Sequence, residues 1–244
     1  MSRDPGRLEV CDDATKLAAA TAAYIVTRAR DAIAKRGNFA LALSGGETPR
    51  ATYELLASTP YRDRIAWEHV EIFFGDERCV PPADARSNYA MARQALLDAV
   101  PLSAGSVYRM CGELDPTLAA NHYAALLADR LGRPPIIDLM LLGLGPDGHT
   151  ASLFPGSDPT NEDEALVRAL YVEKLAMWRL TVTPRVINAA RAVAFIAQGD
   201  AKAQALAAVR MGPWDPKTYP AQIVAPTNGQ LIWFVDEAAA KAQA

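Results

Sequence analysis

The chain has 244 residues, half of them hydrophobic, which is enough for one large α/β domain with a buried core. Its formal net charge of −3, with acidic and basic residues interspersed, excludes a basic stripe or an acidic tail, so neither nucleic acid nor an anionic membrane is expected as a partner. Neither a signal-peptide core nor a stretch of about eighteen apolar residues occurs. We therefore expect a cytoplasmic protein.

Hydrophobic runs alternate along the chain with alanine-rich helical stretches, which is typical of an open, mostly parallel sheet with helices on both faces. Strands are expected over residues 39–43, 70–74, 107–110, 136–142, 179–183, 193–197 and 231–235. Helices are expected over residues 13–35, 49–57, 88–99, 116–131, 184–190 and 201–210, several with a polar cap or a proline at the start. Loops are expected at 155–159 and 212–220, too short to separate domains. The predicted fold is one α/β domain over residues 1–244.

Three cysteines, Cys11, Cys79 and Cys111, are widely spaced and form no C-x-x-C pair. Neither a disulfide framework nor a thiolate metal site is expected from them, and a reducing cytosol fits this pattern. The sequence also contains no H-E-x-x-H motif and no combined set of Cys and His ligands. We therefore expect no bound metal.

The first candidate site is the turn Ser44-Gly45-Gly46-Glu47-Thr48-Pro49, after the first expected strand. Thr48 can cap the following helix and Pro49 can begin it. Backbone N–H groups and the hydroxyls of Ser44 and Thr48 can approach an anion closely here, so phosphate is the natural ligand. Glu47 opposes an anion unless its side chain points outward. An ordinary tight turn is the alternative.

A second candidate follows the strand expected over residues 70–74, in Gly75-Asp76-Glu77-Arg78 and in Asp84-Ala85-Arg86-Ser87-Asn88. Ligands of open α/β sheets bind at the carboxyl ends of strands. The Arg78 guanidinium is therefore a candidate to bind phosphate or carboxylate, with Asp76 or Glu77 holding it. The alternative is a cluster of surface ion pairs in which Ser87 caps a helix.

A third candidate is the turn Gly143-Leu144-Gly145-Pro146-Asp147-Gly148-His149, which places a carboxylate and an imidazole two residues apart. An imidazole near its ordinary pKa takes a proton from water at neutral pH, and a carboxylate fixes its tautomer. His149 is therefore a candidate general base, with Asp147 as its partner. A loop histidine bonded to the backbone is the alternative. The other two histidines, His69 and His122, are expected to be structural or solvated.

The same turn also satisfies the G-x-G-x-x-G pattern of dinucleotide-binding proteins. Its context argues against a dinucleotide, because Pro146 and Asp147 crowd the approach of a pyrophosphate and the carboxylate repels it. The residues that follow, 150–155, do not resemble a glycine-opened helix. Nicotinamide binding is therefore only a minor alternative.

A fourth candidate is the basic pair of Arg179, at the start of a strand, and Lys202, at the start of a helix. A cation in a first helical turn is unfavourable against the helix dipole. Lys202 therefore either meets an anion or turns its ammonium group away toward water.

Together, the turn 44–49, the segment Gly75–Arg78 with Ser87 and Asn88, and the run 144–156 resemble the 6-phosphogluconolactonase family. The resemblance continues through residues 179–181, 187–190, 199–202, 219–221 and 233–239, so that it spans nearly the whole chain. The run 144–156 is its most specific part.

This resemblance implies hydrolysis of 6-phospho-D-glucono-1,5-lactone to 6-phosphogluconate, the second step of the oxidative pentose phosphate pathway, on a Rossmann-like fold and without metal or organic cofactor. It implies a phosphate cradle formed by Ser44, Gly45, Gly46 and Thr48, with Arg179 and Lys202 as cationic partners. Arg78 is expected to face the substrate, and His149 to activate water with Asp147 orienting it. A monomer or a small homo-oligomer is expected.

Two features depart from the family pattern. Glu47 stands where Ser is common, and residues 173–178 lack a proline-rich run, so no substrate contact is assigned to that segment. Two other functions are alternatives. Glucosamine-6-phosphate deaminases share the phosphate turn and the Asp-Gly-His, but their flanking residues differ from Gly75–Arg78 and Ser152–Pro155. A non-catalytic sugar-phosphate sensor is expected to carry a DNA-binding segment, for which the residues before the first helix leave no room.

Overall fold

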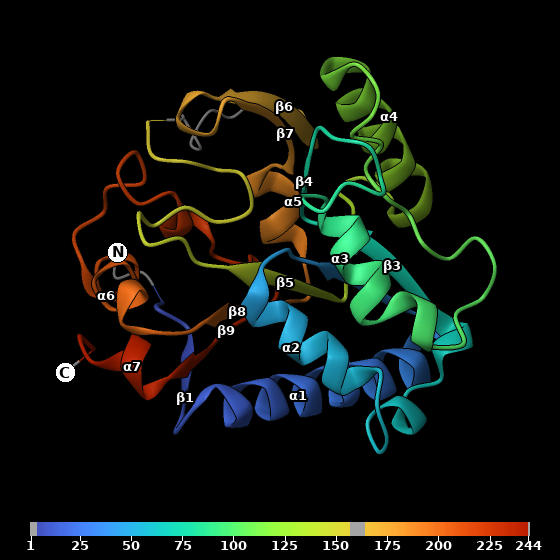
Figure 1. The fold of residues 1–244 in the computed structure, drawn as a ribbon, viewed down its shortest axis with the longest axis horizontal. Coiled ribbons are helices and arrows are strands. Elements are labelled where there is room, and N and C mark those ends of the chain that lie inside the picture. Colours follow the sequence, from blue (N-terminus) through green and yellow to red (C-terminus); the bar gives the residue numbers. More distant parts are fainter. Residues whose placement is uncertain (1–3, 157–163, 244) are drawn as a thin grey trace.

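A six-stranded parallel sheet forms the centre of the computed structural model, which describes residues 4–156 and 164–243 (Figure 1). The strand order is β1-β9-β8-β5-β2-β3. The strands are β1 (Arg7–Cys11), β2 (Phe39–Leu43), β3 (Val70–Phe74), β5 (Leu139–Gly143), β8 (Ala192–Ala197) and β9 (Gln230–Asp236). Strands β2 and β8 are buried along their whole length, as expected for parallel strands covered on both faces.

A second, three-stranded antiparallel sheet packs beside the first, in the order β4-β7-β6. Its strands are β4 (Asp76–Arg78), β6 (Val167–Val172) and β7 (Met177–Val182). Gly75 joins the two sheets, because its N–H donates to the carbonyl of Leu43 at 3.0 Å and its own carbonyl accepts from the N–H of Val182 at 2.9 Å. The chain passes from one sheet to the other within a single residue.

Helices cover the central sheet on both sides. They are α1 (Ala14–Arg36), α2 (Glu47–Leu56), α3 (Asn88–Ala95), α4 (Pro116–Leu131), α5 (Pro184–Ala189), α6 (Ala203–Met211) and α7 (Glu237–Ala240). Short 3₁₀ turns are η1 (Arg62–Arg64), η2 (Trp67–His69), η3 (Leu97–Ala99), η4 (Glu173–Leu175), η5 (Asp200–Lys202) and η6 (Pro220–Ile223). In Figure 1, α1 and α2 lie side by side below the central sheet, whereas α4 and the small sheet lie above it.

The predicted α/β class and the mostly parallel sheet are confirmed, and the loop at 212–220 contains no helix or strand before Pro220. The strand expected over 107–110 is wrong, since only a single bridge joins Val107 to Ile72. Strands β1, β4 and β6 and helix α7 were not predicted. The strand expected over 179–183 lies in the small sheet, as part of β7. Residues 157–159 of the other expected loop lie outside the described residues.

The order of the strands places a topological switch point between β2 and β5. From β2 the chain continues to β3 on one side, whereas from β5 it continues to β8 on the other. At such a point the loops leaving two neighbouring strands diverge and open a crevice at their carboxyl ends. The crevice here lies between the loops that follow Leu43 and Gly143.

Two buried tyrosines hold the carboxyl ends of β2 and β3. The hydroxyl of Tyr53, from α2, accepts from the N–H of Ser44 at 3.0 Å and donates to its carbonyl at 2.9 Å. The hydroxyl of Tyr123, from α4, does the same for Phe74, at 2.9 and 3.2 Å. The backbone N–H and carbonyl groups at the carboxyl ends of these two strands therefore stay hydrogen-bonded. These bonds fix the position at which the crevice begins.

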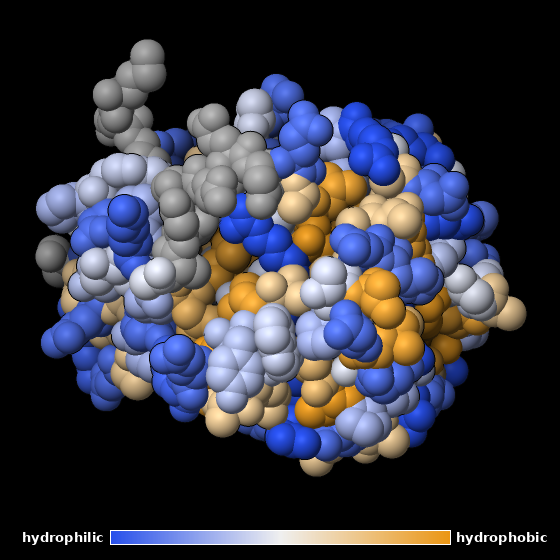
Figure 2. All heavy atoms as spheres, turned by 90° about the horizontal axis from the view of Figure 1, so that it is seen from above, coloured by the Kyte–Doolittle hydropathy of each residue, from blue (hydrophilic) through white to orange (hydrophobic). Residues whose placement is uncertain are grey.

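On the face shown in Figure 2, hydrophobic side chains are recessed between hydrophilic ones that form the periphery. Among the helices of the described residues, none has the length and apolar character needed to span a bilayer.

Asp138 tests how much one buried carboxylate contributes to this fold. It accepts from the N–H of Ala40 at 2.9 Å and from Arg36 at 2.7 Å, and it also pairs with Arg191 at 3.2 Å. Asp138→Ala leaves the buried N–H and the arginines without this partner, so we expect the free energy of unfolding to fall by about 2 to 4 kcal/mol.

Urea unfolding followed by the fluorescence of the buried tryptophans Trp67 and Trp233 measures this loss. Asp98→Ala is the matched control, because Asp98 and its partner Arg93 are both largely exposed and the midpoint should barely move. Equal midpoints for the two variants would contradict the assignment.

Candidate active site

A cavity of about 450 Å³ opens at the carboxyl ends of the central strands. Its walls come from the loops after β2, β5 and β8, from β4 and β7, and from η4. All nine side chains and glycines that the sequence singled out line it, namely Ser44, Gly45, Gly46, Thr48, Arg78, Asp147, His149, Arg179 and Lys202. The structure thus brings the four candidates together, while the roles of the individual residues stay predictions.

The turn after β2 presents unpaired donors to this cavity. Helix α2 begins at Glu47 with Gly46 at its N-cap, so the prediction that Thr48 caps this helix and Pro49 begins it is wrong. The N-cap has a φ of 111°, a backbone conformation suited to glycine. The N–H groups of Gly45, Gly46 and Thr48 donate to no other described residue. The hydroxyl of Ser44 is buried and has no partner within the described part of the chain.

The side chain of Glu47 lies largely in solvent at the edge of this turn. Its side chain is 84% exposed and pairs with Arg50 at 3.4 Å. Solvent and the arginine therefore screen its charge, which meets the condition under which the turn can hold an anion.

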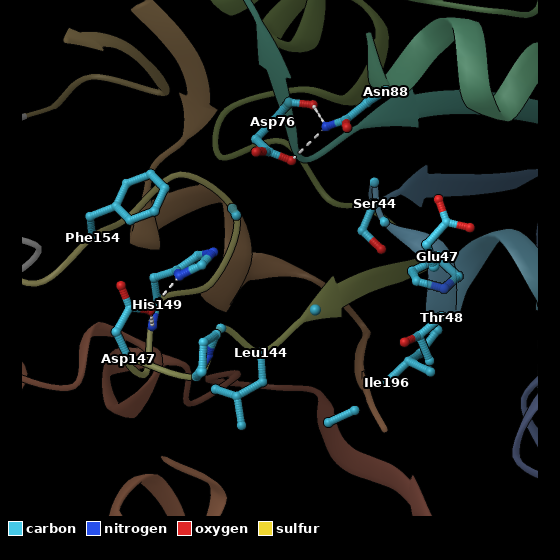
Figure 3. A pocket seen from close by; sticks show the side chains of 18 of the residues that line it. Ser44, Glu47, Thr48, Asp76, Asn88, Leu144, Asp147, His149, Phe154 and Ile196 are labelled. Atoms are coloured by element: carbon cyan, nitrogen blue, oxygen red, sulfur yellow. Dashed lines mark hydrogen bonds and ion pairs between the residues drawn. The ribbon is translucent and has the colours of Figure 1, made fainter. Parts of the chain in front are cut away.

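Gly45 is required by its neighbour Asn88. A Cβ at Gly45 would lie 1.8 Å from Oδ1 of Asn88. The amide of Asn88 in turn donates to the carbonyl and the carboxylate of Asp76, at 2.9 and 3.0 Å (Figure 3). The missing side chain thus allows α3 and β4 to close against the turn.

Asp76 and Glu77 do not hold the Arg78 guanidinium, contrary to the expectation from sequence. Asp76 accepts from Asn88 and from the hydroxyl of Ser152, the latter at 2.7 Å. The Glu77 carboxylate accepts the N–H groups at the start of α3 and the hydroxyl of Ser87, at 2.7 to 2.9 Å. Burial raises the pKa of Glu77, although these hydrogen bonds oppose the shift. Ser87 caps α3, as the alternative interpretation of this segment expected, by accepting from the N–H of Ala90 at 3.1 Å.

The turn after β5 folds His149 back over Gly145. The Gly145 N–H donates to the carbonyl of His149 at 2.8 Å, and a Cβ at Gly145 would lie 1.9 Å from Nδ1 of the imidazole. Nδ1 lies 2.5 Å from Oδ1 of Asp147 (Figure 3). The glycine therefore makes room for the ring that the carboxylate orients.

The environment favours a neutral imidazole in one tautomer. Burial lowers the pKa of His149, outweighing the Asp147 carboxylate, which raises it. Burial raises the pKa of Asp147, but hydrogen bonds from Lys174 and His149 outweigh it and hold that pKa well below its usual range. Because Oδ1 faces Nδ1, we assign the ring proton to Nδ1, which leaves the lone pair on Nε2 free. Nε2 bonds to no described residue.

The G-x-G-x-x-G pattern does not form a dinucleotide turn. Residues 144–156 form turns and one bridge between Thr150 and Leu153, with no helix among them. Gly148 has a φ of 78°, and a Cβ there would lie 2.7 Å from the ring of Tyr219. The glycines thus serve the packing of His149 and Tyr219, not the approach of a pyrophosphate.

Three cations line the cavity without an ion-pair partner in the described residues: Arg78, Arg179 and Lys202. The two arginines lie opposite each other in register on β4 and β7, and the Nε atoms of both are buried without a partner. Burial, followed by the charge of Arg78, lowers the pKa of Arg179. Burial likewise lowers the pKa of Lys202, which Asp147 opposes. Such a group of cations favours an anionic ligand.

The structure adds side chains that the sequence did not single out, above all Lys174, from η4. Its ammonium bonds to Oδ2 of Asp147 and lies 4.6 Å from the ring centroid of Phe154. Phe154 packs on His149 with ring centroids 4.4 Å apart. No local motif marks Lys174, because its contact with Asp147 depends on how the small sheet folds.

Within residues 4–156 and 164–243, no cluster of three or more His, Cys, Asp or Glu side chains is arranged to hold a metal ion.

Comparison with known proteins places the chain in a family. Residues 12–233 match the family model described as glucosamine-6-phosphate isomerases/6-phosphogluconolactonase. A 6-phosphogluconolactonase of Synechocystis sp. is 40% identical over 220 residues, covering 88% of this chain and 89% of the relative. The human 6-phosphogluconolactonase is 37% identical, covering 97% and 93%.

Among solved structures, a 6-phosphogluconolactonase from Trypanosoma brucei superposes with a TM-score of 0.85 at 28% identity, covering 98% of this chain and 99% of the other. The chain therefore belongs to the family of glucosamine-6-phosphate isomerases and 6-phosphogluconolactonases, as an enzyme of the lactonase type.

Proposed function

We propose that the chain hydrolyses 6-phospho-D-glucono-1,5-lactone to 6-phospho-D-gluconate. One observation carries the proposal: the Asp147–His149 pair faces the Ser44–Thr48 turn across a single cavity (Figure 3). A general base and a site for an anion thus lie on opposite sides of one ligand. The names of the relatives support a phosphorylated lactone as that ligand.

The phosphate group binds at the turn after β2. The N–H groups of Gly45, Gly46 and Thr48 and the hydroxyl of Ser44, which bond to no described residue, are donors at the positive end of α2. Arg179 and Lys202 supply the positive charge. Arg78 faces the rest of the substrate.

The imidazole of His149 moves the proton. Nε2 takes a proton from water as the water oxygen attacks the lactone carbonyl carbon, forming a tetrahedral oxyanion. The bond between that carbon and the ring oxygen then breaks, and the imidazolium returns its proton to the leaving oxygen. Asp147 stays bonded to Nδ1–H and stabilises the transient imidazolium. Water and substrate supply every atom of the product, so the proposed step uses no cofactor.

Three further predictions complete this proposal. The chain is one domain, it acts in the cytoplasm, and it is a monomer or a small homo-oligomer.

His149→Ala tests the base. Since the imidazole acts in the transition state, kcat for freshly generated lactone should fall by about 10²- to 10⁴-fold while KM changes little. The rate above spontaneous hydrolysis is the readout. His122→Ala, at an exposed position of α4, should match the wild type. A wild-type kcat for His149→Ala would remove the residue from the mechanism.

Lys202→Ala tests the phosphate site. Loss of a charge-assisted hydrogen bond worth about 1.5 to 3 kcal/mol should raise KM by about 10- to 100-fold, with a smaller effect on kcat. Lys16→Ala, on the exposed part of α1, is the control. If KM is unchanged in Lys202→Ala, the ammonium does not meet the substrate.

A further inference from the structure

Lys174 lies outside every motif of the sequence, yet it contacts the pair on which the proposed function rests. It is carried by η4, in the hairpin that joins β6 to β7. The N–H of Ala176 closes this turn on the carbonyl of Glu173 at 3.0 Å, with Ala176 at a φ of 47°. The hairpin thereby brings a lysine to the rim of the cavity beside Asp147.

Lys174 binds the carboxylate oxygen of Asp147 to which the histidine does not bond. Oδ1 of Asp147 takes both the ring and the backbone N–H of His149, at 2.5 and 3.3 Å. Oδ2 accepts from Lys174 and from no other described residue. Without the ammonium, the carboxylate is free to rotate about its Cβ–Cγ bond and to present either oxygen to the imidazole.

Stability alone does not explain this contact. The Lys174 side chain is 52% exposed, and ion pairs at such positions add little to the free energy of folding. The ammonium also lies over Phe154, whose ring packs on His149, so that the lysine is held at two points that both adjoin the base.

We propose that Lys174 is a positioning residue of the Asp147–His149 pair. It anchors Oδ2 so that Oδ1 keeps the proton on Nδ1 of His149, and it keeps the lone pair of Nε2 directed to the cavity. The proposal rests on the proposed function only for its consequence in catalysis.

Charged groups reach His149 from several elements. Asp147 comes from its own turn, Asp76 from β4 and Lys174 from η4, while Lys202 from η5 acts on Asp147. The carboxylates favour the imidazolium, and Lys174 opposes it. Arg78 and Arg179 line the same cavity. Loss of Lys174 therefore raises the pKa of His149, so the base becomes protonated, and inactive, at a higher pH than in the wild type.

The test compares Lys174→Met, which keeps the length of the side chain without the charge, with Lys174→Arg, which keeps the charge. ¹⁵N NMR of the resting protein follows the titration and the tautomer of His149, assigned among three histidines by loss of its signal in His149→Gln. In Lys174→Met the midpoint should move up by about half a pH unit or more, and the Nδ1–H tautomer should lose population. Lys174→Arg and the remote control Lys16→Met should titrate as the wild type.

The rate gives a second readout. On the acidic limb, kcat of Lys174→Met should fall about threefold for each half unit of that move and recover at higher pH, with KM unchanged. An unmoved His149 titration in Lys174→Met, or an equal move in Lys174→Arg, overturns the role of Lys174. Since NMR needs no turnover, a protein that shifts as expected but does not hydrolyse the lactone refutes the proposed function instead.

Discussion

The site depends on one constraint, the parallel pairing of β2 and β5 in the middle of the central sheet. Parallel neighbours end at the same edge, so the loops after Leu43 and Gly143 start next to each other and diverge. One loop starts a helix with N–H groups that bond to no described residue, and the other sets an imidazole beside a carboxylate. The same topology that buries the hydrophobic strands thus sets the Ser44–Thr48 turn and the Asp147–His149 pair in the walls of one cavity.

Close packing at this edge explains the glycines better than a nucleotide would. Gly45 makes room for Asn88, and Gly145 makes room for His149. Because neither glycine has a side chain, Asn88 and His149 can pack directly against the backbone at these two positions. The hydroxyl of Ser152 donates to Asp76 in the small sheet and so links that sheet to the loop after β5, and residues of both sheets line the cavity.

Elements with strong local signals were predictable from the sequence. Helices α1 and α4 follow Asp13 and Asp115, whose carboxylates cap them, and the buried runs of β2 and β8 are continuous hydrophobic segments. Of the small sheet, only the strand expected over residues 179–183, now part of β7, was predicted. Strand β6 pairs with β7 through a turn at Ala176, which has a positive φ without the usual Gly or Asn.

The nine residues singled out in the sequence all line the cavity, and most of them lie in the glycine-rich turns that follow β2 and β5. Lys174 was missed, since its contact with Asp147 follows from that unpredicted hairpin. The partners of Asp76 and Glu77 were also missed, since these carboxylates accept from residues at the start of α3 and, for Asp76, from Ser152 in the loop after β5. The sequence indicates which charged residues lie near the end of a strand. Tertiary packing determines which donor each carboxylate oxygen accepts a hydrogen bond from.

The most direct test of the central claim is the turnover of the unaltered protein with two phosphorylated substrates. We expect the protein to hydrolyse freshly generated 6-phosphogluconolactone much faster than the lactone hydrolyses spontaneously, and to release no ammonia from glucosamine 6-phosphate. A lactone rate equal to the spontaneous one, or release of ammonia from glucosamine 6-phosphate, would contradict the central claim.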